Sequence, residues 1–286
     1  MGAWMTRLAE RSNPTLPGAV VVSGGPQHPL AGFLPSSHQP LAIGKPDAGL
    51  RNSKMLSGVT EEDFKKRLSL ADQFDKGFRE KYDLKKVRAY SDMYADAVRL
   101  MKSGDLEAFD INKESEATRE AYGDETFGQG ALLARRLVER GVTFVTLIDP
   151  GVGLSSSGWD FHKTLEAHTK TASPPMDLAV TTLINDLHER GLNKKVLVVV
   201  WGEFGRTPKI NKNGGRDHWG PVMSGVLAGA GVATGQVVGA SDRNGSLPSE
   251  HRIPPEDLSA TIFHLMGIDP ETHIEVSGRP FKITSG

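Results

Sequence analysis

Several polar residues of types that could act in catalysis or binding follow an apolar run at residues 196–201. Glu203 and Arg206 follow that run directly, and Arg216, Asp217 and His218 come a little further along the chain. Glycines stand beside both groups, and glycine lets a backbone come close to a metal or an anion. Ligands in open α/β sheets bind outside the carboxyl ends of the strands. If residues 196–201 form a buried strand, these five side chains belong to a polar site near its end.

A second polar pair, Asp160 and His162, follows another apolar run at residues 142–148. Loops that follow neighbouring strands converge on one edge of a sheet, so the two polar groups are expected to meet. Carboxylate oxygen together with imidazole nitrogen suits Zn, Mn or Fe, whereas Mg and Ca prefer oxygen alone. Two metals about 4 Å apart, or one metal beside an arginine, would clamp a phosphate or sulfate oxyanion.

A structural interpretation competes with this one. An Asp-x-His pair alone is a weak signal, Glu203 could cap a turn, and Arg216 with Asp217 could form a surface ion pair. The site interpretation is favoured because three polar groups each lie beside an apolar run and have Gly or Trp next to them. The groups are Asp160 with His162, Glu203 with Arg206, and residues 216–218. The other histidines are interpreted as structural or solvent-exposed: His28, His38, His168, His188, His251, His264 and His273.

Composition limits the class of protein. The 286 residues are 38% hydrophobic and 24% charged, which is typical of a globular domain. The formal net charge of −1 gives no field that would favour nucleic acid or membranes. The absence of Cys excludes disulfides, thiolate metal sites and cysteine nucleophiles. No apolar run approaches the roughly 20 residues of a membrane span, and the N-terminus lacks the apolar core of a signal peptide.

The chain is predicted to consist of an irregular segment, residues 1–58, and one α/β domain, residues 59–286. The first segment is rich in Pro and Gly around one short strand at residues 19–22. Residues 60–140 are predicted to be helical, with Thr60 as an N-cap and the stripe Phe64, Leu68, Ala71, Phe74 and Phe78 as core packing. Residues 141–286 alternate strands (142–148, 196–201, 222–228) with helices (174–190, 255–266). This order predicts a mostly parallel central sheet flanked by helices.

Several strings resemble one family in their order along the chain. They are GWDFH, DLHERGL, VLVVVWGEFGRTPKIN, GGRDHW, GVLAGAGV, GQVVGASD and ATIFHLMGID. Together they resemble the bacterial DUF1501 proteins, over roughly residues 20–286. The resemblance implies the sulfatase-like branch of the alkaline phosphatase superfamily and its α/β fold. Two departures stand out: Phe204 occupies a place where the superfamily often has a metal-binding His, and the first strand with its Asp ligand and Ser or Thr nucleophile is not found. The chain is therefore expected to be incomplete on its N-terminal side.

The resemblance also implies roles for individual residues. Asp160, His162 and His218 would share one metal, and Glu203 would serve a second. The expected cofactor is one or two divalent ions, with Zn favoured and Mn, Ca or Mg as alternatives. The implied oxyanion-binding group is Arg206 or Arg216, and Asp217 is interpreted as orienting His218 or Arg216.

The expected activity of the intact protein is metal-dependent hydrolysis of sulfate or phosphate esters, and an inactive fragment is one interpretation of the chain as given. The rival interpretation is a non-catalytic module that binds a metal, an anion or a sulfated glycan, and it draws support from the nucleophile that is not found. A small anionic ester or a sulfated glycan is the expected partner, without nucleic acid or a membrane span. A periplasmic or exported location is implied by the family alone.

Overall fold

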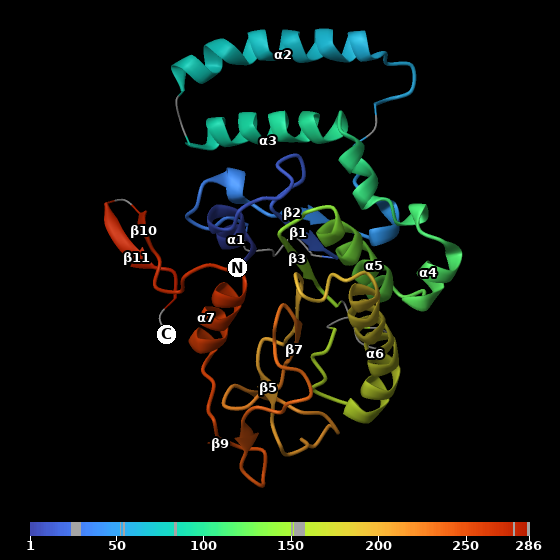
Figure 1. The fold of residues 1–286 in the computed structure, drawn as a ribbon, viewed down its shortest axis with the longest axis vertical. Helices are drawn as coiled ribbons and strands as arrows, with labels where there is room; N and C mark the ends of the chain where they lie inside the picture. Colours follow the sequence, from blue (N-terminus) through green and yellow to red (C-terminus); the bar gives the residue numbers. More distant parts are fainter. Residues whose placement is uncertain are drawn as a thin grey trace. The chain divides into compact units, whose positions relative to one another are not determined.

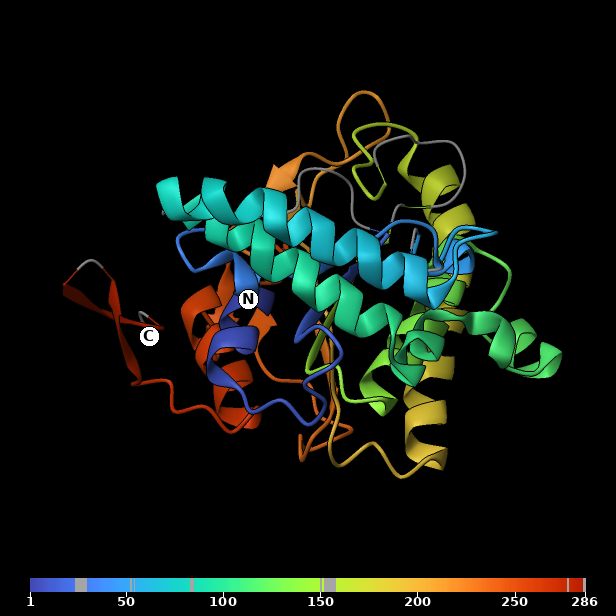
Figure 2. The same ribbon diagram turned by 90° about the horizontal axis from the view of Figure 1, so that it is seen from above.

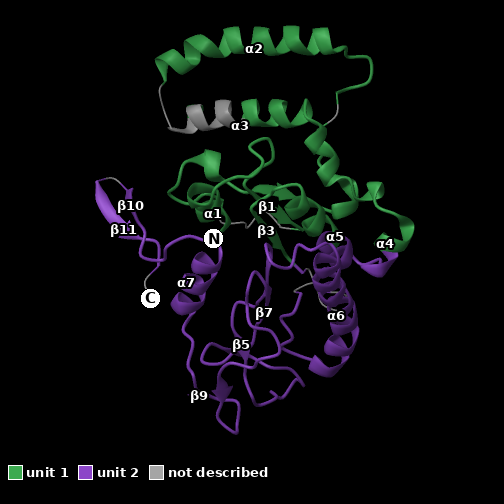
Figure 3. Cartoon of the chain, in the orientation of Figure 1, with its two compact units in different colours: residues 1–119, 132–148 green, residues 120–131, 149–286 purple. Residues whose placement is uncertain are grey.

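The computed structural model describes residues 1–23, 30–51, 53, 55–82, 85–149, 151, 158–276 and 278–284. The chain divides into two compact units, shown in Figure 3. Unit 1 contains residues 1–119 and 132–148, and unit 2 contains residues 120–131 and 149–286. The N-terminal segment, residues 1–58, lies in unit 1 and supplies two strands to its sheet.

The core of unit 1 is a parallel sheet in the order β2-β1-β3. The central strand is β1 (Ala19–Val22), between β2 (Leu41–Ile43) and β3 (Phe144–Leu147). All four residues of β1 are buried, as expected of a parallel strand whose two faces are covered. The predicted strands at 19–22 and 142–148 are therefore confirmed. The N-terminal segment is more regular than predicted, since it also forms α1 (Gly2–Leu8) and β2.

The outer part of unit 1 is a pair of long helices, α2 (Glu61–Lys81) and α3 (Lys85–Met101), visible in Figures 1 and 2. The predicted N-cap of α2 is confirmed, because the Thr60 hydroxyl accepts a hydrogen bond from the Asp63 N–H at 3.1 Å. The predicted core stripe of α2 is wrong for Phe74 and Phe78, which are 76% and 54% exposed. Within the described residues α2 has no fully buried side chain, although Phe64, Leu68 and Ala71 of the same stripe are half-buried.

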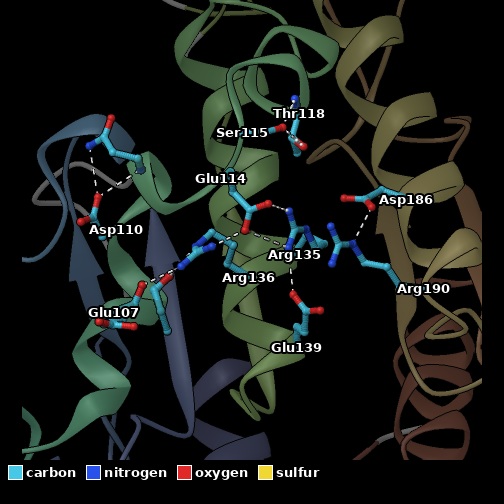
Figure 4. A network of polar contacts seen from close by, with 12 residues as sticks. Glu107, Asp110, Glu114, Ser115, Thr118, Arg135, Arg136, Glu139, Asp186 and Arg190 are labelled. Atoms are coloured by element: carbon cyan, nitrogen blue, oxygen red, sulfur yellow. Dashed lines mark hydrogen bonds and ion pairs between the residues drawn. The ribbon is translucent and has the colours of Figure 1, made fainter.

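A buried ion cluster of Glu114, Arg135, Arg136 and Glu139 lies in unit 1, as Figure 4 shows. Both arginines lie on α5 (Thr126–Glu139), whose residues are divided between the two units. The same helix carries the buried leucines at 132, 133 and 137. Arg136 also donates to the backbone carbonyls of residues 107 and 108, so the cluster ties α5 to the segment before it.

Short elements complete unit 1 and the start of unit 2. They are η1 (Ser36–His38), η2 (Pro46–Ala48), η3 (Gly104–Phe109), η4 (Ile111–Lys113) and α4 (Glu116–Ala121). In the part of the chain that the structure describes, no helix combines the length and the apolar character that crossing a membrane requires.

Unit 2 pairs β4 (Leu197–Val200) with β7 (Val226–Gly229) in antiparallel register. The mostly parallel central sheet was expected to include these strands, so the observed topology differs from the prediction. The reason is the connection: a parallel pair needs a crossover, usually a helix. The chain between β4 and β7 instead forms the antiparallel pair of β5 (Gly205–Arg206) and β6 (His218–Trp219). What holds at the coarser level is a mixed α/β chain with a small parallel sheet of three strands.

In the described residues, the rest of unit 2 includes the helices α6 and α7 and two further strand pairs, besides the first part of α5. Helix α6 begins well before the predicted start at 174, and Pro174 and Pro175 lie inside it. The elements are α6 (Leu165–Glu189), β8 (Ala240–Ser241), β9 (Pro248–Glu250), α7 (Pro255–Leu265), β10 (His273–Val276) and β11 (Arg279–Lys282). The pairs β8–β9 and β10–β11 are antiparallel.

Candidate metal centre

The β5–β6 pair places the first group of predicted site residues. Arg206 lies opposite His218 in this antiparallel pair. Beyond it the Thr207 N–H donates to the Asp217 carbonyl oxygen at 2.9 Å and prolongs the ladder. Opposite residues of an antiparallel pair have neighbouring side chains. Short-range pairing therefore brings two of the predicted residues together, one from each of the glycine-flanked groups.

A second loop brings Asp160 and His162 to the same hairpin. The Arg216 N–H donates to the carbonyl oxygen of Phe161, which stands between those two residues, at 3.0 Å. The two backbones approach so closely that glycine is required at position 215. A Cβ atom built on Gly215 would lie 2.0 Å from the His162 carbonyl carbon. The glycine signal in the sequence thus reflects contact between two loops of unit 2.

Three potential ligand atoms meet where the loops join. The Nε2 atoms of His162 and His218 are 3.1 Å apart, and each lies 3.0 Å from Oδ1 of Asp160. The three side chains are 37–50% exposed, so the cluster opens to solvent. Asp160, His162 and His218 are therefore a group that could hold a metal ion.

The three contacts within this triangle cannot all be hydrogen bonds. An ionised carboxylate only accepts, so both imidazoles would need a proton on Nε2 to bond Asp160. The two N–H groups would then face each other, donor against donor. Removing either proton would set a nitrogen lone pair against the carboxylate oxygen. A cation resolves this conflict because it takes a lone pair from each atom, and ligand distances of about 2.0–2.2 Å fit Zn²⁺.

Arg206 stabilises the charged form of Asp160. Its Nη1 donates to Oδ1 of Asp160 at 2.5 Å. This hydrogen bond, and after it the one from His218, holds the pKa of the Asp160 carboxyl below its ordinary value. Phe204 packs beside the site, with its ring 4.3 Å from the His218 ring and beneath the Arg206 guanidinium. The ligand set therefore has a cationic and an aromatic neighbour.

Asp217 pairs with His162 rather than with His218 or Arg216, which corrects the predicted partner. Oδ1 of Asp217 lies 2.9 Å from Nδ1 of His162. The hydrogen bond from His162, and next the one from Asn211, lowers the pKa of the Asp217 carboxyl. An ionised Asp217 places the proton on Nδ1 and leaves Nε2 of His162 free to bind a metal. Carboxylate–histidine pairs of this kind orient metal ligands in proteins.

Of the predicted site residues outside the triangle, Arg206 and Asp217 bond to it, whereas Glu203 and Arg216 have no side-chain hydrogen bond to it in the described part of the chain. Glu203 is exposed, and in the described part of the chain the group of ligand atoms within 4.8 Å of one another does not include it. The side chain of Arg216 is half-buried, and within the same residues its Nε atom is buried without a hydrogen-bond partner. The described residues thus bring together three side chains that could hold one ion, and Glu203 is not among them.

Sequence reasoning missed Asn211, a residue that supports the site. Asn211 bonds both loops, as its side-chain amide donates to the His162 carbonyl at 3.0 Å and to Asp217 at 3.1 Å. His168, interpreted from the sequence as structural or exposed, is buried and stacks on Phe161 with ring centroids 4.8 Å apart. An aromatic residue between Asp160 and His162 was the only sequence signal for such a support.

Comparison with known proteins agrees with the resemblance of the motifs. No curated protein and no solved structure matches the chain. The family model described as "Protein of unknown function (DUF1501)" matches residues 1–286. The match covers both units and all three residues of the triangle, and the chain belongs to the DUF1501 family.

Proposed function

We propose that the chain binds one divalent metal ion through Asp160, His162 and His218 and uses it to hydrolyse sulfate or phosphate esters. The observation that carries the proposal is the triangle of mutual contacts at 3.0–3.1 Å, which a cation satisfies and hydrogen atoms do not. Two imidazoles with one carboxylate favour Zn or Mn over Mg or Ca. The family resemblance of the motifs supports the ester-hydrolase part.

The residues around the triangle fit this chemistry. When bound, a divalent ion acts as a Lewis acid and makes water nucleophilic at neutral pH. The Arg206 side chain donates a hydrogen bond to Asp160, so its guanidinium lies beside the proposed metal ligands. The planar fork of an arginine matches two oxygens of a sulfate or phosphate group. Asp217 holds the imidazole of His162 in the orientation that exposes Nε2. Arg216 is a second candidate for the oxyanion.

The alternative is a module that binds a metal together with an anion or a sulfated glycan and does not turn it over. One observation favours it: the described residues bring together the ligands of a single ion, and Glu203 stands apart. A clamp of two metals on the attacking and leaving oxygens would then not form. The two functions share the metal site and differ in turnover.

The test combines metal analysis with an assay panel on the chain. Bound metal would be measured after dialysis against Zn²⁺ or Mn²⁺, and aryl sulfates and aryl phosphates would be offered as substrates. We expect stoichiometric metal and metal-dependent hydrolysis, both lost in His218→Ala. His188→Ala is the matched control, because His188 is exposed on α6. Metal and anion binding without turnover would favour the binding module. Failure to bind either metal would overturn both.

A further inference from the structure

We propose that Asn211 is the positioning residue of the metal centre: it holds the Asp217 carboxylate against His162 and so selects the ring tautomer that presents Nε2 to the ion. The metal-binding part of this inference rests on the proposed function. Asn211 lies on the loop between β5 and β6 and contributes no ligand atom to the triangle. Its effect on the ion would pass through Asp217 and His162.

The side-chain amide of Asn211 uses its donors and its acceptor in different directions. Nδ2 donates to the backbone carbonyl of His162 at 3.0 Å and to Oδ1 of Asp217 at 3.1 Å. Oδ1 accepts from the N–H groups of Asn213 and Gly215 at 2.9 and 3.1 Å. An asparagine amide has two donor hydrogens and two acceptor sites, so this amide is fully bonded. The donors of Asn211 therefore bond to residues of the site, and its acceptor bonds to the backbone of its own loop.

One oxygen of Asp217 receives both Asn211 and His162. Oδ1 lies 3.1 Å from Nδ2 of Asn211 and 2.9 Å from Nδ1 of His162. The Asp217 side chain is 56% exposed, so solvent would otherwise compete for it and its rotamer would be free to change. Because Asn211 donates to the same oxygen and to the His162 backbone, it fixes the carboxylate relative to that residue. Asp160 lies 3.0 Å from Nε2 on the other side of the ring, so the two carboxylates compete for the ring proton. The bond from Asn211 favours Asp217 in this competition and so favours the proton on Nδ1.

The turn that carries Asn211 has backbone bonds of its own. The Asn211 N–H donates to the Gly215 carbonyl at 2.8 Å, and the Gly214 N–H donates to the Asn211 carbonyl at 3.0 Å. The loop therefore keeps part of its shape when only the side-chain donors are removed. This separation lets a substitution distinguish a positioning role from a purely structural one.

Asn211→Asp is the decisive variant, because an aspartate keeps the acceptor toward the loop and loses both donors. Asn213→Asp is the matched control: it adds the same charge two residues away, at an exposed position that bonds Asn211 through its backbone N–H. Asn211→Ala removes the donors without adding charge, but it also removes the acceptor toward the N–H groups of Asn213 and Gly215. An effect shared by the Asp and Ala variants is therefore due to the lost donors, and not to repulsion against Asp217 or to the lost loop bonds. All three variants and the unchanged chain would be compared at neutral pH.

Two measurements test the inference. Long-range ¹H–¹⁵N spectra of the metal-free protein report which ring nitrogen of His162 carries the proton. Calorimetry reports the affinity for Zn²⁺. We expect the Nδ1–H tautomer to dominate in the unchanged chain and in Asn213→Asp, and both tautomers to appear in Asn211→Asp and Asn211→Ala. Zn²⁺ affinity should fall about 10-fold to 100-fold in both Asn211 variants, the range typical of lost partners of metal ligands.

The outcomes separate this inference from the proposed function. An unchanged His162 tautomer in both Asn211 variants would overturn the positioning role, whether or not the chain binds metal. A redistributed tautomer in the metal-free variants supports it even if the unchanged chain fails to bind Zn²⁺, in which case the proposed function alone fails. A tautomer change in Asn211→Asp that Asn211→Ala does not share would assign the effect to repulsion and also contradict the inference.

Discussion

The chain contains two clusters of acidic and basic side chains, the buried ion cluster of unit 1 and the triangle of unit 2, and they differ in their exposure to solvent. In the buried ion cluster of unit 1, Glu114 faces Arg135 and Arg136, and Arg135 also bonds Glu139 at 2.8 Å. The side chains of Arg135 and Glu114 are 1% and 13% exposed. In the triangle of unit 2 the side chains are 37–50% exposed.

The clusters differ in whether their contacts are complementary. The contacts of the buried ion cluster join guanidinium donors to carboxylate or carbonyl acceptors, with two cations and two anions. The triangle of Asp160, His162 and His218 contains three contacts that protons cannot satisfy together. A complementary and buried cluster holds a fold together, whereas an exposed cluster whose mutual contacts conflict is a candidate ligand site. Substitutions in the first cluster should therefore change stability, and substitutions in the second should change binding.

Replacing Glu114 by Ala should reduce stability more than any other change considered. The substitution leaves two buried guanidinium groups without their shared carboxylate, and breaking a buried pair costs about 3–5 kcal/mol. We expect the free energy of unfolding, measured by urea denaturation, to fall by that amount. Glu116→Ala, at an exposed position of α4, should change it by less than about 0.5 kcal/mol. Equal effects of both variants would show that the buried ion cluster is not a structural unit.

Metal should stabilise the chain through the triangle and not through the buried ion cluster. A ligand at about 100 times its Kd raises the free energy of unfolding by about 2.7 kcal/mol. We expect this gain with Zn²⁺ in the unchanged chain and none in His218→Ala, whose stability without metal should be nearly unchanged. Thermal unfolding with and without Zn²⁺ measures both. A gain that persists in His218→Ala would place the ion elsewhere.

The contact between the two site loops should tolerate no side chain at position 215. An Ala there places its Cβ 2.0 Å from the His162 carbonyl carbon, so the loops must separate. Overpacking of this kind costs about 1–3 kcal/mol. We expect Gly215→Ala to lose stability in that range and to lose Zn²⁺ affinity. Gly220→Ala is the control, because a Cβ at Gly220 meets no atom within 4 Å; similar losses there would contradict the close contact.

The buried ion cluster should also give stability a pH dependence. Burial alone would raise the pKa of the Glu114 carboxyl, but the hydrogen bonds from Arg135 and Arg136 prevail and lower it below the ordinary 4.5. The carboxylate therefore contributes stability that is complete above about pH 4.5 and is lost as the pH falls through the lower folded pKa. The stability difference between the unchanged chain and Glu114→Gln, measured by urea denaturation at several pH values, should shrink with acidification below that pH. A difference that stays constant down to pH values well below the folded pKa would contradict the ionised pairing.

Much of the fold could be predicted because its strands are short apolar runs. Residues 142–148 and 196–201 contain β3 and β4, and the central strand β1 has the predicted extent because it is buried on both faces. The direction of pairing could not be predicted for β4 and β7, because it depends on a connection without a helix. The exposure of α2 could not be predicted either, since an amphipathic pattern does not reveal whether its apolar face finds a partner in the chain.

Some residues of the candidate site could also be predicted from the sequence, and others could not. The residues of the triangle could be proposed because carboxylate and imidazole groups followed apolar runs and matched a family pattern. Glu203 satisfied the same local rule, yet the structure leaves it exposed outside the triangle. Asn211 could not be found from the sequence, because its role arises from bonds to His162, 49 positions away. Asp217 was predicted to orient His218 or Arg216, whereas its carboxylate lies 2.9 Å from Nδ1 of His162, 55 positions away in the chain.

Arg206→Lys should change stability little and anion binding strongly. The pair of Arg206 and Asp160 is partly exposed, with side chains 22% and 37% accessible, and pairs of this kind contribute about 0–1 kcal/mol. A lysine keeps the charge but loses the planar fork that matches two oxygens of an oxyanion. We therefore expect stability to change by less than about 1 kcal/mol, while inhibition or binding by sulfate and phosphate weakens. Lys209→Arg, an exposed change on the same loop, is the control. A loss of stability as large as that of Glu114→Ala would make Arg206 a structural arginine like those of the buried ion cluster, and the distinction between the two clusters would then fail.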